Sequence, residues 1–218
     1  NNFYDLTLTD GASLPAALTV DNDLTISGTL TGNSNQITVS GNWTNNGTYT
    51  AGATGEVIFT NTSKTSRISG ATTFQDMKVT LTAGAGANGK VLSLEAGVTQ
   101  TVAGLLTLTG DKDILFGDIV YVYLTSSSPG AQASIDASGT NTLDYLYVQD
   151  SNAVTPLTVA NSIDAGNNTG WSITGPTNTW VGGDPGNETD WFTDANWSLG
   201  TVPAGTDTAV IPAGTTYY

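Results

Sequence analysis

This chain of 218 residues contains no cysteine and no histidine. Their absence excludes disulfide bonds, thiol nucleophiles, imidazole bases and the zinc or haem sites that depend on these two side chains. Charge is also scarce, because only 11% of the residues are charged. No apolar run is long enough to span a bilayer, so we expect no membrane insertion.

Basic residues are the rarest charged type. Five lysines and arginines stand against 19 aspartates and glutamates, which gives a net charge of -14. Nucleic-acid affinity depends on neutralising phosphates with Lys and Arg, so we expect no nucleic-acid partner. The bases all lie between Lys64 and Lys112, and only acids follow. We interpret the excess as a solvated acidic surface, with divalent cations or a neighbouring subunit as the alternative partners.

Short runs that alternate apolar and small polar residues fill most of the chain. Examples are "DLTISGTLTG" (Asp23–Gly32), "QITVSGNWT" (Gln36–Thr44) and "VIFT" (Val57–Thr60), with Gly, Asn, Asp or Ser turns between such runs. Their period is two, and no segment has the period of an amphipathic helix. The sequence therefore predicts an all-β protein, either a parallel β-helix (solenoid) or an antiparallel β-sandwich.

Internal similarity favours the solenoid. "NFYDLTLT" (Asn2–Thr9) aligns with "TFQDMKVT" (Thr73–Thr80) at an offset of 71 residues, and "TLDYLYVQ" from Thr142 follows at an offset of 69. These offsets predict a unit of several coils used two or three times. Against this, Asn46-Gly47 in "WTNNGTY" is a strong hairpin signal, and a hairpin would make the local strands antiparallel. We predict a β-solenoid repeat domain over residues 1–174.

A second unit is expected over residues 175–218. A Gly175-Pro176 break is followed by three tryptophans, Trp180, Trp191 and Trp197. We interpret this segment as a small Trp-rich β module and as the start of a further repeat unit, with the large rings forming its core.

Two binding sites are conceivable in this module. Oxygen-bearing side chains crowd a turn-rich stretch and suit calcium, although their spacing matches neither an EF-hand nor the glycine-rich calcium repeat; they are Asp184, Asn187, Glu188, Asp190 and Asp194. Calcium is the one cofactor that the sequence points to. Alternatively, exposed rings of Trp191 and Trp197 would bind a glycan. No residue pattern marks a catalytic site, so we expect no enzyme activity.

Several segments resemble repetitive bacterial cell-surface and secreted proteins, the adhesin-like β-strand-repeat kind of Bacteroidetes. They are "GTLTG", "ITVSGNWTNNGTYTAG", "DYLYVQDSNAV", "NSIDAGNNTGW" and the stretch from Asn178 to Gly214. The resemblance implies an extracellular or cell-surface scaffold or adhesin-stalk subunit, which is either part of a larger polypeptide or self-assembles head to tail into a filament or surface layer. A carbohydrate-binding adhesin module is the alternative, and a polysaccharide-degrading enzyme is a distant third.

Overall fold

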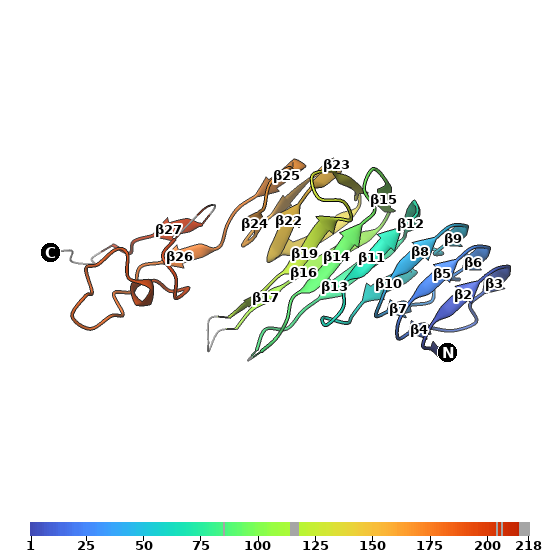
Figure 1. Cartoon of the computed structure of the whole chain (residues 1–218), viewed down its shortest axis with the longest axis horizontal. Coiled ribbons are helices and arrows are strands. Elements are labelled where there is room, and N and C mark those ends of the chain that lie inside the picture. Colours follow the sequence, from blue (N-terminus) through green and yellow to red (C-terminus); the bar gives the residue numbers. More distant parts are fainter. Residues whose placement is uncertain (85, 114–117, 204, 206, 214–218) are drawn as a thin grey trace.

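Short strands follow one another with tight corners between them, and each strand lies beside the strand one coil earlier. The computed structural model describes residues 1–84, 86–113, 118–203, 205 and 207–213. Its strands build long parallel sheets, so the protein is an all-β parallel solenoid and the antiparallel sandwich is wrong. The molecule is elongated, with the N-terminus on the first coil and the C-terminal module beyond the last (Figure 1).

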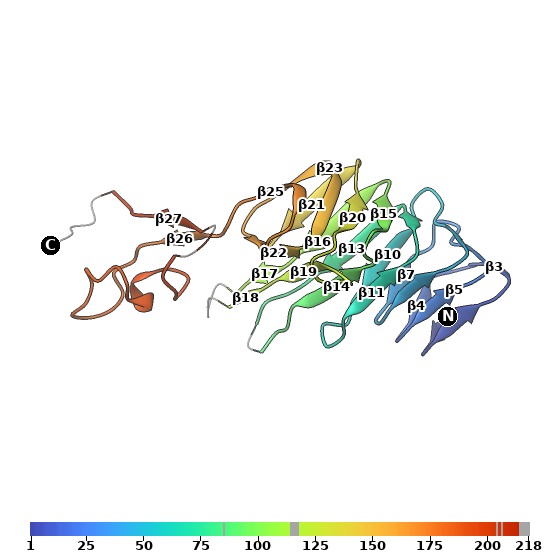
Figure 2. The ribbon, with the colours of Figure 1, turned by 45° about the horizontal axis from the view of Figure 1, so that its top comes forward.

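Each coil contributes one strand to each of three stacks, except that the last coil reaches the first stack only through an isolated bridge between Asp144 and Ala160. The first sheet contains β1 (Asn2–Phe3), β4 (Leu18–Val20), β7 (Ile37–Val39), β10 (Glu56–Phe59), β13 (Asp76–Thr80), β16 (Leu105–Thr109) and β21 (Thr140–Asp144). The second contains β2 (Leu6–Leu8), β5 (Leu24–Ile26), β8 (Trp43–Asn45), β11 (Ser66–Ser69), β14 (Lys90–Leu94), β19 (Val122–Ser126), β22 (Leu146–Gln149) and β24 (Ile163–Asp164). Figure 2 shows these strands stacked along the long axis.

The third stack is split into two hydrogen-bonded sheets. One holds β3 (Gly11–Ser13), β6 (Thr29–Thr31) and β9 (Thr48–Thr50). The other holds β12 (Thr72–Phe74), β15 (Thr99–Val102), β20 (Ala133–Asp136), β23 (Ser151–Val159) and β25 (Thr169–Ile173). The backbone ladder is therefore interrupted between β9 and β12.

The predicted alternation decides which side chains form the core. In β10, Val57 and Phe59 are buried while the residues between them are not, and Leu92 and Leu94 of β14 repeat the pattern. Because successive side chains of a strand point to opposite faces, each coil places one apolar row inside and one polar row outside. One continuous core results along the solenoid.

The hairpin expected at Asn46-Gly47 is wrong. β8 and β9 belong to different sheets, and each pairs in parallel with the coil before it. Asn46 donates its backbone N–H to Ile26, and Thr48 donates to Gly28, so the turn is a solenoid corner. Gly47 is needed there because a Cβ would lie 2.0 Å from the Gly28 carbonyl oxygen.

The repeat of 69 to 71 residues is not a structural unit. Asn2–Thr9 and Thr142–Gln149 run from the first sheet into the second, whereas Thr73–Thr80 runs from β12 of the third stack into β13 of the first. The coils also lengthen, since Val57 pairs with Ile37 about 20 residues earlier and Asn141 pairs with Leu106 about 35 residues earlier. The similar segments each mark a corner followed by a strand, and that strand belongs to the second sheet in two of them and to the first sheet in the other.

Two elements stand outside the three stacks. The antiparallel hairpin of β17 (Asp111–Lys112) and β18 (Ile119–Val120) extends from the sixth coil. The C-terminal module contains the parallel pair β26 (Thr177–Thr179) and β27 (Thr208–Val210) and the 3-10 turn η1 (Asp194–Asn196). Residues 204, 206 and 214–218 of the predicted module lie outside the described residues. In the part of the chain that the structure describes, no helix is long and apolar enough to cross a membrane.

Candidate functional site

Several acidic side chains of the solenoid lie at its corners and accept backbone N–H groups of the next coil. Asp5 Oδ1 accepts from Asp23 at 3.0 Å, Asp23 Oδ1 accepts from Asn42 at 2.8 Å, and Asn42 Oδ1 continues the ladder by accepting from Arg67 at 2.9 Å. Other carboxylates that accept a backbone N–H are those of Asp76, Glu95, Asp111 and Asp150. Charged acceptors make strong hydrogen bonds, so part of the acidic excess stabilises the coils.

The tryptophans of the C-terminal module form one cluster. Trp180 stacks on Trp191 with ring centroids 5.4 Å apart, and Trp197 meets both rings edge-on at 5.0 Å. Trp180 and Trp197 are buried, and the Trp197 indole N–H donates to the Trp191 carbonyl oxygen. These contacts make the rings the core of a module that has few other large apolar side chains.

Four of the residues considered for calcium lie in the loop that runs from β26 to η1, and the fifth, Asp194, is the first residue of η1. Internal hydrogen bonds occupy several of them. Asn187 donates its side-chain amide to Asp184 at 2.9 Å, and Asp194 accepts the backbone N–H of Val202 at 2.8 Å. The backbone N–H of Phe192 and the Thr193 hydroxyl hold the pKa of Asp190 below its usual value.

Glu188 is the remaining carboxylate of this set. The backbone N–H groups of Gly186 and of Glu188 itself lower its pKa. Among the described residues, no three acidic side chains lie close enough together to hold a metal ion. Calcium binding by this loop stays a prediction, which a calcium titration monitored by tryptophan fluorescence would test.

The two tryptophans considered for a glycan differ in access. Trp197 is only 2% exposed and cannot offer a ring face to a sugar, whereas Trp191 is 39% exposed. Phe192 is 82% exposed beside it, a residue that the sequence analysis does not single out. An aromatic surface on this module would therefore consist of Trp191 and Phe192.

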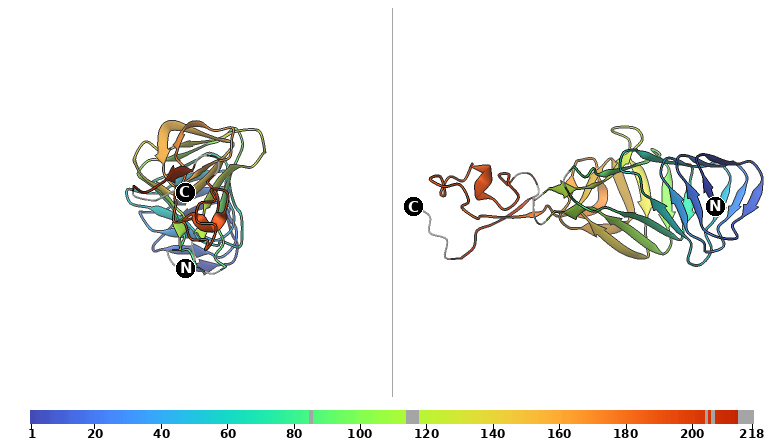
Figure 3. Two further views of the ribbon diagram at one scale, coloured as in Figure 1. Left: turned by 90° about the vertical axis from the view of Figure 1, so that its left-hand side faces the viewer. Right: turned by 90° about the horizontal axis from the view of Figure 1, so that it is seen from below.

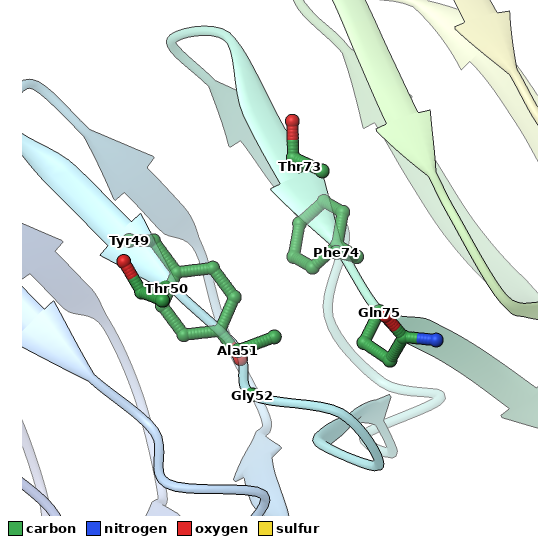
Figure 4. A pocket seen from close by; sticks show the side chains of 7 residues that line it. All are labelled: Tyr49, Thr50, Ala51, Gly52, Thr73, Phe74 and Gln75. Carbon is green, nitrogen blue, oxygen red and sulfur yellow. The ribbon is translucent and has the colours of Figure 1, made fainter.

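A notch of about 190 Å³ opens where β9 and β12 fail to pair (Figure 4). The rings of Tyr49 and Phe74 form its wall, with centroids 6.2 Å apart, and Trp43 packs against both from the core. Burial raises the pKa of the Tyr49 hydroxyl well above its ordinary value. The lining contains no charged side chain; it consists of Tyr49, Thr50, Ala51, Gly52, Thr73, Phe74 and Gln75. We interpret the notch as the packing consequence of an interrupted sheet.

Lys90 is completely buried, which the sequence analysis does not anticipate. Its ammonium group donates to the carbonyl oxygens of Asn61 and Lys64 at 2.8 and 2.9 Å and to Ser66 Oγ at 2.8 Å. Burial, with a smaller effect from the charge of Lys64, lowers the pKa of Lys90 to about 8. Lys90 thereby ties down the loop between β10 and β11. The sequence does carry a signal for the burial of Lys90. Lys90 lies two residues before Leu92, whose side chain points inward, so the alternation along β14 places Lys90 on the same inward face.

Four tyrosines form a block on the outer face of the second sheet. Tyr123 of β19 pairs with Tyr147 of β22, and the residues two positions earlier on each strand path are Tyr121 and Tyr145. Ring centroids lie 5.1 Å apart for Tyr123 and Tyr147 and 6.4 Å apart for Tyr121 and Tyr145. The sequence signal for this tyrosine block is the spacing Tyr-x-Tyr, which occurs in both strand paths. The residue between the two tyrosines is buried in each case, so the tyrosines lie on the outer face.

Compared with known proteins, the chain matches no family model, no curated protein and no solved structure. The geometry described above is therefore the basis for its function.

Proposed function

We propose that this chain is an extracellular structural rod whose first coil joins it to a second copy or to another coil of a larger surface polypeptide. The observation that carries the proposal is the uncapped edge of that first coil. Among the described residues, β1, β2 and β3 each pair with a strand on one side only.

The free edge offers backbone groups in the register that a further coil needs. Leu6 donates its N–H to Asp23, and Leu8 accepts from Ser27, so both residues direct their backbone toward β5. Neighbouring residues of a strand direct these groups to opposite sides, and the N–H and C=O of Thr7 therefore point away from the solenoid. Such an edge is a template for another strand.

Apolar surface accompanies the open backbone. Phe3 is 43% exposed and Tyr4 is 67% exposed, while Leu6 and Leu8 are only partly buried. In the next coil the partners of Phe3, Leu6 and Leu8 are covered, because Val20, Leu24 and Ile26 are fully buried. A stacked coil would remove this apolar area from water and favour association.

Further strand edges lie toward the other end. Figure 3 shows the C-terminal module extending from the end of the solenoid that is opposite the first coil. β25 ends the third stack, and β27 is exposed along its whole length, with Val210 and Ile211 more than a third exposed. Contact between one end of a copy and the other end of the next is heterologous, and such contacts propagate into filaments.

The substitution Thr7→Pro tests this proposal. Proline removes the outward N–H of β2 and projects its ring from the edge, while the existing bonds of Leu6 and Leu8 to β5 remain. We expect the variant to keep the thermal stability of the wild type and to lose association in sedimentation velocity over a concentration series. Thr7→Val is the matched control and should associate as the wild type does. Equal association of Thr7→Pro and Thr7→Val would contradict a joint at this edge.

A carbohydrate-binding module is the second candidate, and the exposure of Trp191 beside Phe192 favours it. Glycan-induced quenching of tryptophan fluorescence should then disappear in Phe192→Ala. An unchanged titration in that variant would remove this surface as the binding site.

A further inference from the structure

A cavity lies at the seam between the solenoid and the C-terminal module. Its volume is about 280 Å³, and both parts of the chain line it. The solenoid side supplies Asp118, Ile119 and Tyr121, and the module side supplies Pro176, Leu199, Thr201 and Asp207. Figure 2 shows the β17–β18 hairpin at the end of the solenoid that faces β26.

The lining combines an apolar wall with negative charge. Ile119, Pro176 and Leu199 are apolar, Tyr121 adds an aromatic ring, and no lysine or arginine is among the lining residues. Burial, the charge of Asp207 and the nearby Tyr145 and Tyr123 raise the pKa of Tyr121 to about 12. A negative field at the ring is consistent with that direction, because it opposes formation of a phenolate. Anionic ligands are therefore disfavoured.

The rings of the tyrosine block that contains Tyr121 are not coplanar, and their mutual angles limit the kind of ligand that they can bind. The ring planes meet at 71° for Tyr121 and Tyr123, at 60° for Tyr121 and Tyr145, and at 42° for Tyr123 and Tyr147. A flat sugar platform needs coplanar rings, and these rings do not provide one. Of this block, Tyr121 lines the cavity together with Asp118 and Asp207. An aromatic ring beside carboxylates suits a cation, which is attracted to a ring face and forms charge-assisted bonds with carboxylates.

We propose that this seam cavity binds an organic cation, an alkylammonium or guanidinium group, with its carbon chain against Ile119, Pro176 and Leu199 and its charge between Asp118 and Asp207. The same chemistry is carried by a free amine and by a Lys or Arg side chain of another protein. The proposal is independent of association through the first coil.

Calorimetric titration of the intact chain tests the cavity. The probes are butylammonium, butylguanidinium and, as a neutral match, butanol. We expect saturable binding of the two cations that weakens with salt, and no binding of butanol. Asp118→Asn and Tyr121→Leu should each weaken cation binding at least tenfold, whereas Asp21→Asn, which removes the same charge from an exposed site on the second coil, should leave it unchanged.

A second arm identifies the source of the cation. Binding of a blocked lysine tripeptide as tight as that of butylammonium would indicate a protein side chain, and binding of butylammonium alone would indicate a free amine. Equal binding of butanol, preference for neutral oligosaccharides, or equal effects of Asp21→Asn and Asp118→Asn would each overturn the proposal.

Discussion

At the scale of single residues, polar side chains tie successive coils together. Asp5, Asp23 and Asn42 accept backbone N–H groups at one corner, and Lys90 donates to the loop between β10 and β11. A buried polar group left without its partner costs about 1–3 kcal/mol, which applies to the partners of Lys90, whereas the exposed hydrogen bonds of Asp5 and Asn42 contribute less.

Lys90→Met should destabilise the protein by about 1–3 kcal/mol, because two carbonyl oxygens and a hydroxyl lose their donor. The wild type should also show a pH dependence that the variant lacks. The pKa of Lys90 is about 8 when folded against 10.5 ordinarily, so between these values the unfolded chain binds more protons. The free energy of unfolding should then rise with pH from about 8.

Urea denaturation between pH 7.5 and 9.5 measures this effect. The pH window ends below 10 because tyrosines of the unfolded chain ionise above that value. The folded pKa of Tyr121 is raised, so above about pH 10 the unfolded chain loses this proton first and the free energy of unfolding falls with pH. A wild-type profile that is as flat as that of Lys90→Met would contradict the assignment.

At this scale, the sequence predicts the environment of a residue well when its side chain is stable in only one kind of environment. Large rings in a small module predict a core, and Trp180 and Trp197 are buried. The hydrogen-bond partners of Asp190 and Asp194 could not be predicted from the sequence, because they depend on how the loop folds. No local pattern specifies those partners.

At the scale of elements, the alternation of apolar and polar residues predicts the strands, and the corners decide how they pair. Asn46-Gly47 matches a hairpin turn and a solenoid corner equally well in sequence. The choice is made by the preceding coil, since Ile26 and Gly28 accept the N–H groups of Asn46 and Thr48. A local motif therefore cannot distinguish parallel from antiparallel neighbours without the coil on which it rests.

Gly47→Ala should destabilise the solenoid by about 3 kcal/mol, because the new methyl group would force the backbone of two stacked corners apart. Gly11→Ala is the control, since a Cβ at Gly11 meets nothing within 4 Å. Urea midpoints of the two variants should differ clearly, with Gly11→Ala close to the wild type. Similar midpoints would show that the corner tolerates a side chain.

At the scale of the whole molecule, the solenoid is an elongated stack with an open first coil. The second sheet stacks eight strands, which corresponds to an axial length of about 34 Å at the usual strand spacing. The alternation of apolar and polar residues predicts the all-β class, but the joint between copies depends on which backbone groups remain unpaired. Only the hydrogen-bond register of Leu6 and Leu8 identifies Thr7 as the outward residue.

Net charge should oppose this joint. Every copy carries -14, so copies repel one another at low ionic strength. Added salt screens that repulsion while the backbone and apolar contacts remain, and we expect association to increase between 20 and 300 mM sodium chloride. Light scattering at fixed protein concentration measures this, and a decrease with salt would indicate a joint held by opposite charges instead.

The most direct measurement is negative-stain electron microscopy of the purified chain over a concentration series at 300 mM salt, with calcium and with chelator. We predict filaments with a regular axial repeat that grow with concentration and are absent in Thr7→Pro. Loss of the filaments with chelator would indicate that calcium takes part in the contact between copies. Isolated particles at every concentration would contradict head-to-tail association through the first coil.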